Sequence, residues 1–131
     1  GKADKTYLAV VEGSPNPSQG RIDQPLRTDY ENQQVIVGPH KDAKKAVTHF
    51  KTLRTVNGRS LVEVRLETGR HHQILAHMAW LGHPIVGDGN YGTYGPRTGL
   101  HAVSLSITRP ETGKRLTFET PAPANMMDLL Q

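Results

Sequence analysis

The segment LETGRHHQILAHMAWLGHPIVGDGNYG (residues 66–92) holds the densest group of side chains that could do chemistry. Its histidines, Arg70 and Asp88 suit three kinds of site: a metal centre, a nucleotide-binding loop, or a surface that binds nucleic acid. Arg70 stands at the start of an expected helix, where backbone N–H groups lack helical partners. Its guanidinium and those N–H groups together suit a phosphate or a carboxylate. In the alternative interpretation, Arg70, His72 and Gln73 only satisfy buried polar groups at the helix entry.

A metal centre, a phosphate loop and a hydrolase fit this segment poorly. Zinc-binding helices place ligands at i and i+4, whereas His72 and His77 are five positions apart and lie on different helix faces. The glycines of residues 87–92 follow the expected helix, whereas a phosphate-binding loop opens one. There is no G-x-S-x-G motif, and Ser104 and Ser106 fall within an expected strand. We therefore expect neither a metal nor a nucleotide cofactor.

Composition limits the class of protein. The 131 residues suit a single domain, 1–131, with one core, and the absence of cysteine excludes disulfides and thiol chemistry. No apolar run approaches the roughly 18 residues of a membrane-spanning helix, so we expect no membrane partner. A cytoplasmic location is expected, or an organellar matrix in a eukaryote. The net charge of +4 is concentrated in residues 41–59. The basic side chains there, including Lys44 and Lys45, either contact phosphate or form a solvated face.

The elements that must position these residues are mostly strands. Ile74, Met78 and Leu81 recur with the period of a helix. Gly82 then supplies a stop, so the spacing predicts one helix over 71–81. Strands or extended runs are expected at 6–13, 21–26, 33–39, 44–69 (a hairpin turning at Asn57-Gly58), 100–110 and 114–121, with a loop at 14–20, a turn at 110–114 and a short helix at 124–130. This pattern predicts an α+β domain with a mostly antiparallel sheet and one main helix.

The segment 66–92 closely resembles the signature of the RluA-type RNA pseudouridine synthases, which runs approximately L-x-T-G-R-T-H-Q-I-R-x-H-x-x-x-x-G-H-P-I-x-G-D-x-x-Y-G. The runs KTYLAVVEG, GRIDQPL and KAVTHFKTL support the resemblance upstream, and LHAVSLSITRPETGKRLTFETPAP supports it downstream. The resemblance extends from Lys5 to about Leu130. It implies that the chain is the C-terminal part of a pseudouridine synthase catalytic domain.

The family isomerises uridine in ribosomal or transfer RNA to pseudouridine without a cofactor or a metal. The resemblance implies that the target base is flipped into a pocket, where an Asp carboxylate starts the reaction. A Tyr of the K-x-Y motif lies over the uracil and is implicated in the final proton removal. An Arg of the H-Q-I-R motif pairs with the Asp and keeps it ionised. The site residues we expect here are Tyr7 in catalysis and Arg70, His72, Gln73, Lys44 and Lys45 in binding rRNA or tRNA.

The chain departs from the family pattern where the chemistry is done. The catalytic Asp of the family lies in a motif like H-R-L-D-x-x-T-S-G, which does not occur in these 131 residues. Its Arg partner should fall at position 75, which is Leu75 here, and His71 stands where Thr is usual. Two other Asp residues match different family positions. We expect Asp23 to cap or order the turn that follows it, and Asp88 to be a loop residue beside the pocket.

Two functions remain open from the sequence. In the first, the chain is part of a pseudouridine synthase catalytic domain, inactive alone, and a sheet edge is left open where the missing strands belong. In the second, it is a non-catalytic RNA-binding module derived from that family. The second interpretation rests on the joint absence of the Asp and its Arg partner, while Arg70, His72 and Gln73 are kept. A structural protein that only contacts other proteins is a third interpretation with less support.

Overall fold

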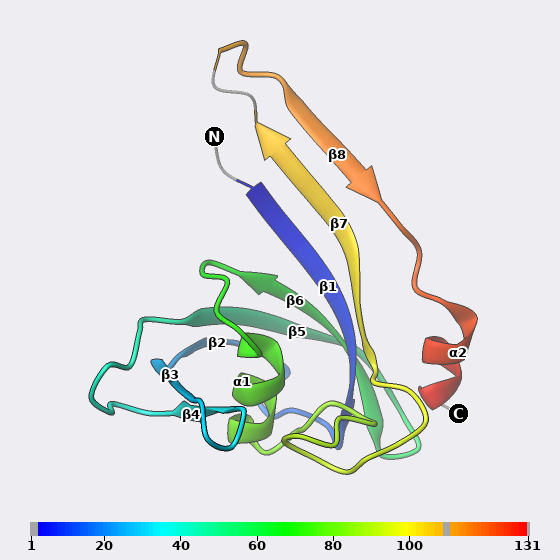
Figure 1. Cartoon of the computed structure of the whole chain (residues 1–131). Helices are drawn as coiled ribbons and strands as arrows, with labels where there is room; N and C mark the ends of the chain where they lie inside the picture. Colours follow the sequence, from blue (N-terminus) through cyan, green and yellow to red (C-terminus); the bar gives the residue numbers. More distant parts are fainter. Residues whose placement is uncertain (1–2, 109–110, 131) are drawn as a thin grey trace.

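The computed structural model describes residues 3–108 and 111–130, and over these ranges the chain forms strands, one main helix and a short helical end (Figure 1). The strands are β1 (Ala3–Glu12), β2 (Gln19–Asp23), β3 (Leu26–Asp29), β4 (Gln34–Val37), β5 (Val47–Val56), β6 (Arg59–Leu66), β7 (Leu100–Thr108) and β8 (Arg115–Glu119). The helices are α1 (Gln73–Leu81), α2 (Ala124–Met127) and a 3₁₀ turn, η1 (Asp128–Leu130). The predicted α+β class with a mostly antiparallel sheet is confirmed.

Six strands form one antiparallel sheet in the order β2-β5-β6-β1-β7-β8. The predicted hairpin is β5–β6, and its turn lies at Asn57-Gly58, whose φ angles of 51° and 81° suit the two-residue turns that join twisted strands. Within the part of the chain that the structure describes, β2 and β8 each pair on one side only. Both ends of the sheet are therefore open edges.

A small second sheet, β3–β4, packs beside α1. Our expected extended run over 21–26 is interrupted here, because β2 ends at Asp23 and β3 begins at Leu26. We did not predict β3 as a strand. Leu26 and Val35 of this hairpin are buried against Ala76 of α1, so the hairpin is fastened to the helix by its own small apolar cluster.

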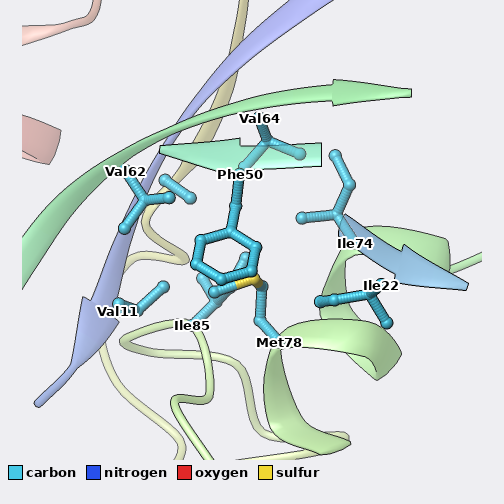
Figure 2. Packing of buried hydrophobic residues seen from close by; sticks show 9 residues of the cluster. Val11, Ile22, Phe50, Val62, Val64, Ile74, Met78 and Ile85 are labelled. Atoms are coloured by element: carbon cyan, nitrogen blue, oxygen red, sulfur yellow. The ribbon is translucent and has the colours of Figure 1, made fainter. Parts of the chain in front are cut away.

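The large sheet carries a core on each face. On one face, β1, β2, β5 and β6 pack against α1, and Figure 2 shows Phe50 of β5 extending from the sheet towards Met78 of the helix. On the other face, Val10 and Leu61 pack against Met126 and Leu130 of the C-terminal helical segment. Alternate residues of β1 therefore serve opposite cores, as the two-residue period of a strand requires.

Helix α1 begins two residues later than predicted. The expected start was His71, but His72 adopts the left-handed conformation with a φ of 53°, so the helical backbone begins at Gln73. The predicted end is confirmed. Gly82 has a φ of 97°, and its N–H and that of His83 donate to carbonyls of the last turn, the usual way in which a glycine ends a helix.

The C-terminal third forms the predicted strand pair and short helix, as β7, β8 and the segment α2–η1. Residues 109–110 of the expected strand and of the expected turn 110–114 lie outside the described residues. Figure 1 shows β1, β7 and β8 running together away from α1. Among the described residues, no helix is long and apolar enough to cross a membrane.

Candidate functional site

A cavity of about 230 Å³ opens between β1, the end of β6 and the first turn of α1. We call it the Tyr7 cavity. Its walls are Tyr7, Leu66, Arg70, His72, Gln73, Ile74, Leu75 and Leu100. Tyr7 lies on the central strand β1, opposite Val64 of β6 and Ala102 of β7. The fold thus brings together Tyr7 and the Arg70–Gln73 group, which are far apart in the sequence.

Gln73 builds the turn before α1. Its side chain is buried, and its amide oxygen accepts hydrogen bonds from Thr68 Oγ1 (2.8 Å) and from the backbone N–H of Arg70 (3.0 Å). Its amide nitrogen donates to the carbonyl of Val47 (2.9 Å) and to Thr48 Oγ1 (3.0 Å). We expected Gln73 to contact RNA, but both ends of its amide are used inside the protein. Gln73 is a positioning residue that holds Arg70 at the mouth of the cavity.

The same hydrogen-bond chain continues to His77. Thr48 Oγ1 lies 2.7 Å from His77 Nδ1, and His77 Nε2 lies 2.8 Å from the carbonyl oxygen of Gln24. A carbonyl can only accept, so Nε2 carries the proton, and Nδ1 accepts from Thr48. His77 is fully buried, and desolvation lowers the pKa of its imidazole. His77 is therefore a neutral structural residue that ties α1 to β5 and to the segment after β2.

The two Nη nitrogens of Arg70 are available to a ligand. Its Nε donates to the carbonyl of Lys45 at 2.9 Å, which fixes the direction of the side chain. Among the described residues, its two Nη nitrogens make no hydrogen bond or ion pair with protein. Arg70 is exposed and borders both the Tyr7 cavity and a second, larger cavity. This arrangement suits a phosphate or carboxylate, as Arg supplies several donors in a fixed plane.

His72 presents its ring to the Tyr7 cavity. Its ring stacks on that of His71, with centroids 3.8 Å apart, and its Nδ1 lies 2.9 Å from the Tyr91 hydroxyl. Tyr91 accepts the backbone N–H of Val35 at 2.8 Å, which leaves its own proton free for Nδ1 of His72. Desolvation and the neighbouring His71 lower the pKa of His72, so it is neutral near pH 7. With Nδ1 accepting, Nε2 is the N–H donor that His72 offers.

Lys44 and Lys45 stand outside the Tyr7 cavity. Lys44 exchanges backbone hydrogen bonds with Leu26, and its exposed side chain borders the larger cavity beside Arg70. Lys45 is also exposed, and its carbonyl is the acceptor for Arg70 Nε. Both positions are compatible with phosphate contacts, and neither side chain reaches the space in front of Tyr7.

The carboxylates of Asp88 and Asp23 both contact protein groups outside the Tyr7 cavity. Asp88 is 3% exposed and accepts the backbone N–H of Asn90 at 3.0 Å, so it orders the loop after α1; we expected a loop residue beside the pocket, and Asp88 is a loop residue that does not border the Tyr7 cavity. Asp23 differs from our expectation that it caps or orders the turn before Pro25. It pairs with Arg21 in the same strand (3.2 Å), and this exposed contact contributes little to stability.

Sequence reasoning missed Tyr91 and Thr48. Tyr91 joins the loop after α1 to Val35 and to His72, and Thr48 lies between Gln73 and His77 in the buried chain. Tyr91 is the Tyr of the G-D-x-x-Y-G part of the signature, and Thr48 lies in the supporting run KAVTHFKTL, so the resemblance marked both positions without indicating their contacts. Among the described residues, no group of three or more His, Asp or Glu side chains is placed to hold a metal ion.

Comparison with known proteins finds RNA pseudouridine synthases by both family model and individual relatives. The sequence model of a family described as RNA pseudouridylate synthase matches residues 1–80. An uncharacterized RNA pseudouridine synthase of Bacillus subtilis is 40% identical over 134 residues, which cover 97% of this chain and 43% of the relative. Ribosomal large subunit pseudouridine synthase D of Zymomonas mobilis is 34% identical over 98% of this chain and 44% of its own length.

A solved structure agrees with these relatives. That of human RNA pseudouridylate synthase domain containing 1 superposes with a TM-score of 0.79 at 29% identity, over 92% of this chain and 55% of that one. The chain spans less than half the length of the curated relatives described above.

Proposed function

Because the chain belongs to the RNA pseudouridylate synthase family, we propose that it is the part of a catalytic domain that holds the target uridine of an RNA. The observation that carries this proposal is the Tyr7 cavity. Tyr7, which corresponds to the Tyr that lies over the uracil in the family, shares that cavity with Arg70 and His72. An aromatic ring, a guanidinium and an N–H donor are suited to stack on a flipped base and to bind its polar edge or its phosphate.

The reaction itself needs a carboxylate that the 131 residues do not supply in the family's motif. In this proposal, the nucleophilic Asp comes from a part of the protein outside these residues. Tyr7 then stands over the base for the proton removal that completes the isomerisation. The chain alone binds RNA and forms no pseudouridine.

Leu75 supports a second candidate function, an RNA-binding module without chemistry. Its side chain borders the Tyr7 cavity with Leu66, Ile74 and Leu100, so the wall is apolar where the family has the Arg partner of the Asp. A carboxylate placed against that wall would be desolvated without its usual partner and would be harder to ionise. Arg70 is the one side chain bordering this cavity, among the described residues, with a permanent positive charge.

Both candidate functions require that the chain binds RNA, and a salt titration of RNA binding tests this requirement. We would measure the affinity of the chain for a fluorescein-labelled single-stranded RNA while KCl is raised from 50 to 200 mM. Phosphate contacts predict an affinity that falls steeply with salt, and Arg70→Ala should reduce the log–log slope by about 0.7, the share of one phosphate contact on a single strand. Arg54→Ala, an exposed arginine of β5, is the control and should change less.

Nucleoside analysis of the same RNA separates the two candidates. The chain alone should leave every uridine unchanged. A longer chain that joins these residues to an H-R-L-D-like motif should form pseudouridine if the enzyme interpretation holds, and should only bind if the module interpretation holds. Absence of RNA binding at 50 mM KCl contradicts both.

A further inference from the structure

Two larger cavities adjoin the Tyr7 cavity on the side of the β3–β4 hairpin. The first, of about 500 Å³, is bordered by Arg27, Lys44 and Arg70 together with Tyr30 and His71. The second, also about 500 Å³, lies between the hairpin tip and His72 and is bordered by Tyr30 and Asn90 as well. Arg70 and His72 are also walls of the Tyr7 cavity. The two larger cavities are therefore immediate neighbours of the Tyr7 cavity, and together we call these two the hairpin groove.

The charge of the hairpin groove suits a phosphate chain. The first cavity is bordered by three cationic side chains, Arg27, Lys44 and Arg70. Among the described residues that border it, Asp42 is the one acidic side chain. Arg27 Nε is buried and has no hydrogen-bond partner among the described residues. Hydrogen bonds from Asn32 and, to a smaller extent, the nearby charge of Arg27 lower the pKa of the Asp29 carboxyl, but the oxygens of Asp29 are engaged by the hairpin turn. The groove keeps a net positive charge.

The hairpin tip presents an aromatic ring on a fixed turn. Tyr30 is 85% exposed and directly follows Asp29. Asp29 Oδ1 accepts the backbone N–H of Glu31 at 3.2 Å, and Oδ2 accepts the Asn32 side-chain amide at 2.8 Å. This Asx-type turn holds the backbone around Tyr30. An exposed tyrosine on an ordered turn beside a cationic groove is a stacking platform whose backbone loses little freedom when a base binds.

The hairpin itself is held at a fixed distance from the Tyr7 cavity. The Tyr91 hydroxyl bonds both to Val35 N–H of β4 and to His72, and Gln34 Nε2 donates to the carbonyl of Asn90 at 2.7 Å. These hydrogen bonds connect the β3–β4 hairpin, the loop after α1 and His72, so the hairpin groove and the Tyr7 cavity keep a fixed relative position.

We propose that the hairpin groove binds single-stranded nucleotides that flank the target uridine, with one base stacked on Tyr30 and the phosphates between them held by Arg27, Lys44 and Arg70. This inference rests on the proposed function, because it places the flanking RNA next to the uridine pocket. It names the substrate class of the site as an unpaired loop or strand. A duplex cannot lay a single base on Tyr30 without opening a pair.

The test compares two labelled RNAs on the whole chain by fluorescence anisotropy, a ten-nucleotide oligouridine and a twelve-base-pair RNA duplex. The single strand should bind more tightly. Tyr30→Ala should weaken its binding by about tenfold, within the range measured when a stacking aromatic is removed, and Tyr30→Phe should stay within about twofold of the unmodified chain. Tyr94→Ala is the matched control, since Tyr94 is also 85% exposed but borders neither cavity of the groove, and it should have no effect.

A second variant tests the phosphate contacts. Lys44→Ala should lower the salt slope for the single strand by about 0.7, whereas Lys51→Ala on the exposed side of β5 should leave it unchanged. Lys44 is exposed, so this variant is expected to fold even if an Arg27 variant does not. The proposal that the hairpin groove binds RNA is overturned if Tyr30→Ala leaves the affinity unchanged, or if Tyr30→Ala and Tyr94→Ala lose affinity equally. Either result leaves the proposed function standing. If the unmodified chain binds neither RNA, the proposed function and the groove both fail.

Discussion

Replacing Gln73 with Leu tests whether the turn before α1 depends on a buried amide. The change keeps a side chain of similar size and removes four hydrogen bonds, two donated by the amide nitrogen and two accepted by the amide oxygen. At about 0.5–1.5 kcal/mol for each bond, the loss lies between about 2 and 6 kcal/mol.

The surroundings of Gln73 narrow that range. The Val47 carbonyl keeps the N–H of Glu67, and Thr48 keeps its bond to His77. Thr68 Oγ1 still accepts the N–H of Val47, but its own O–H and the backbone N–H of Arg70 both lose the Gln73 oxygen as acceptor. Both of these donors are only partly buried, so we expect the lower half of the range, a fall of about 3 kcal/mol in the free energy of unfolding. For a chain of this length, that corresponds to roughly 10 °C in Tm.

Urea unfolding followed by circular dichroism measures this change, and m should stay constant if only stability is altered. Gln19→Leu on the edge strand β2 is the control, because Gln19 is exposed and should change stability by less than about 0.5 kcal/mol. A Gln73→Leu variant within about 1 kcal/mol of the unmodified chain would refute the reasoning. It would mean that apolar packing, and not the amide, holds the turn.

Two further predictions concern pH and backbone geometry. Burial lowers the pKa of His77 below its ordinary 6.5, so the unfolded chain binds more protons, and stability should fall as pH drops below about 6.5. Urea unfolding between pH 7.5 and 5.5 should show this slope, and His77→Gln, which can keep both hydrogen bonds, should reduce it; an equal slope in both proteins would contradict the assignment. A Cβ on Gly87 (φ 80°) would lie 1.9 Å from the Arg97 carbonyl oxygen, whereas one on Gly58 (φ 81°) would meet nothing within 4 Å. Gly87→Ala should therefore cost more than about 3 kcal/mol and Gly58→Ala about 1 kcal/mol, and equal thermal shifts would show that the loop yields without strain.

Much of the fold could be predicted because its signals are local. The Asn57-Gly58 turn between two β-rich runs and the stripe of Ile74, Met78 and Leu81 define the hairpin and the helix from neighbouring residues alone. The helix start could not be placed from that stripe. A single left-handed residue, His72, delays it by two positions, and periodicity carries no information about one φ angle.

The residues of the candidate site could be predicted, but which of them are buried and which face a ligand could not. The sequence placed Arg70, His72 and Gln73 at the helix entry, and they are found there. Which of them faces a ligand depends on contacts with β5 and with the loop that carries Tyr91, and these are distant in sequence. The fold therefore turned Gln73 inward and left Arg70 outward, although the two lie only three residues apart.

The measurement that tests the central claim most directly is a titration of the ¹⁵N-labelled chain with oligouridine, followed by amide chemical shifts. If the Tyr7 cavity holds a uridine, the largest shifts should cluster at Tyr7, Arg70, His72 and Leu75. Tyr7→Ala should weaken this response without unfolding the chain. Shifts confined to the basic exposed side of β5, around Lys51 and Arg54, would contradict the account, because they would show that RNA is held by a charged face and not by the cavity.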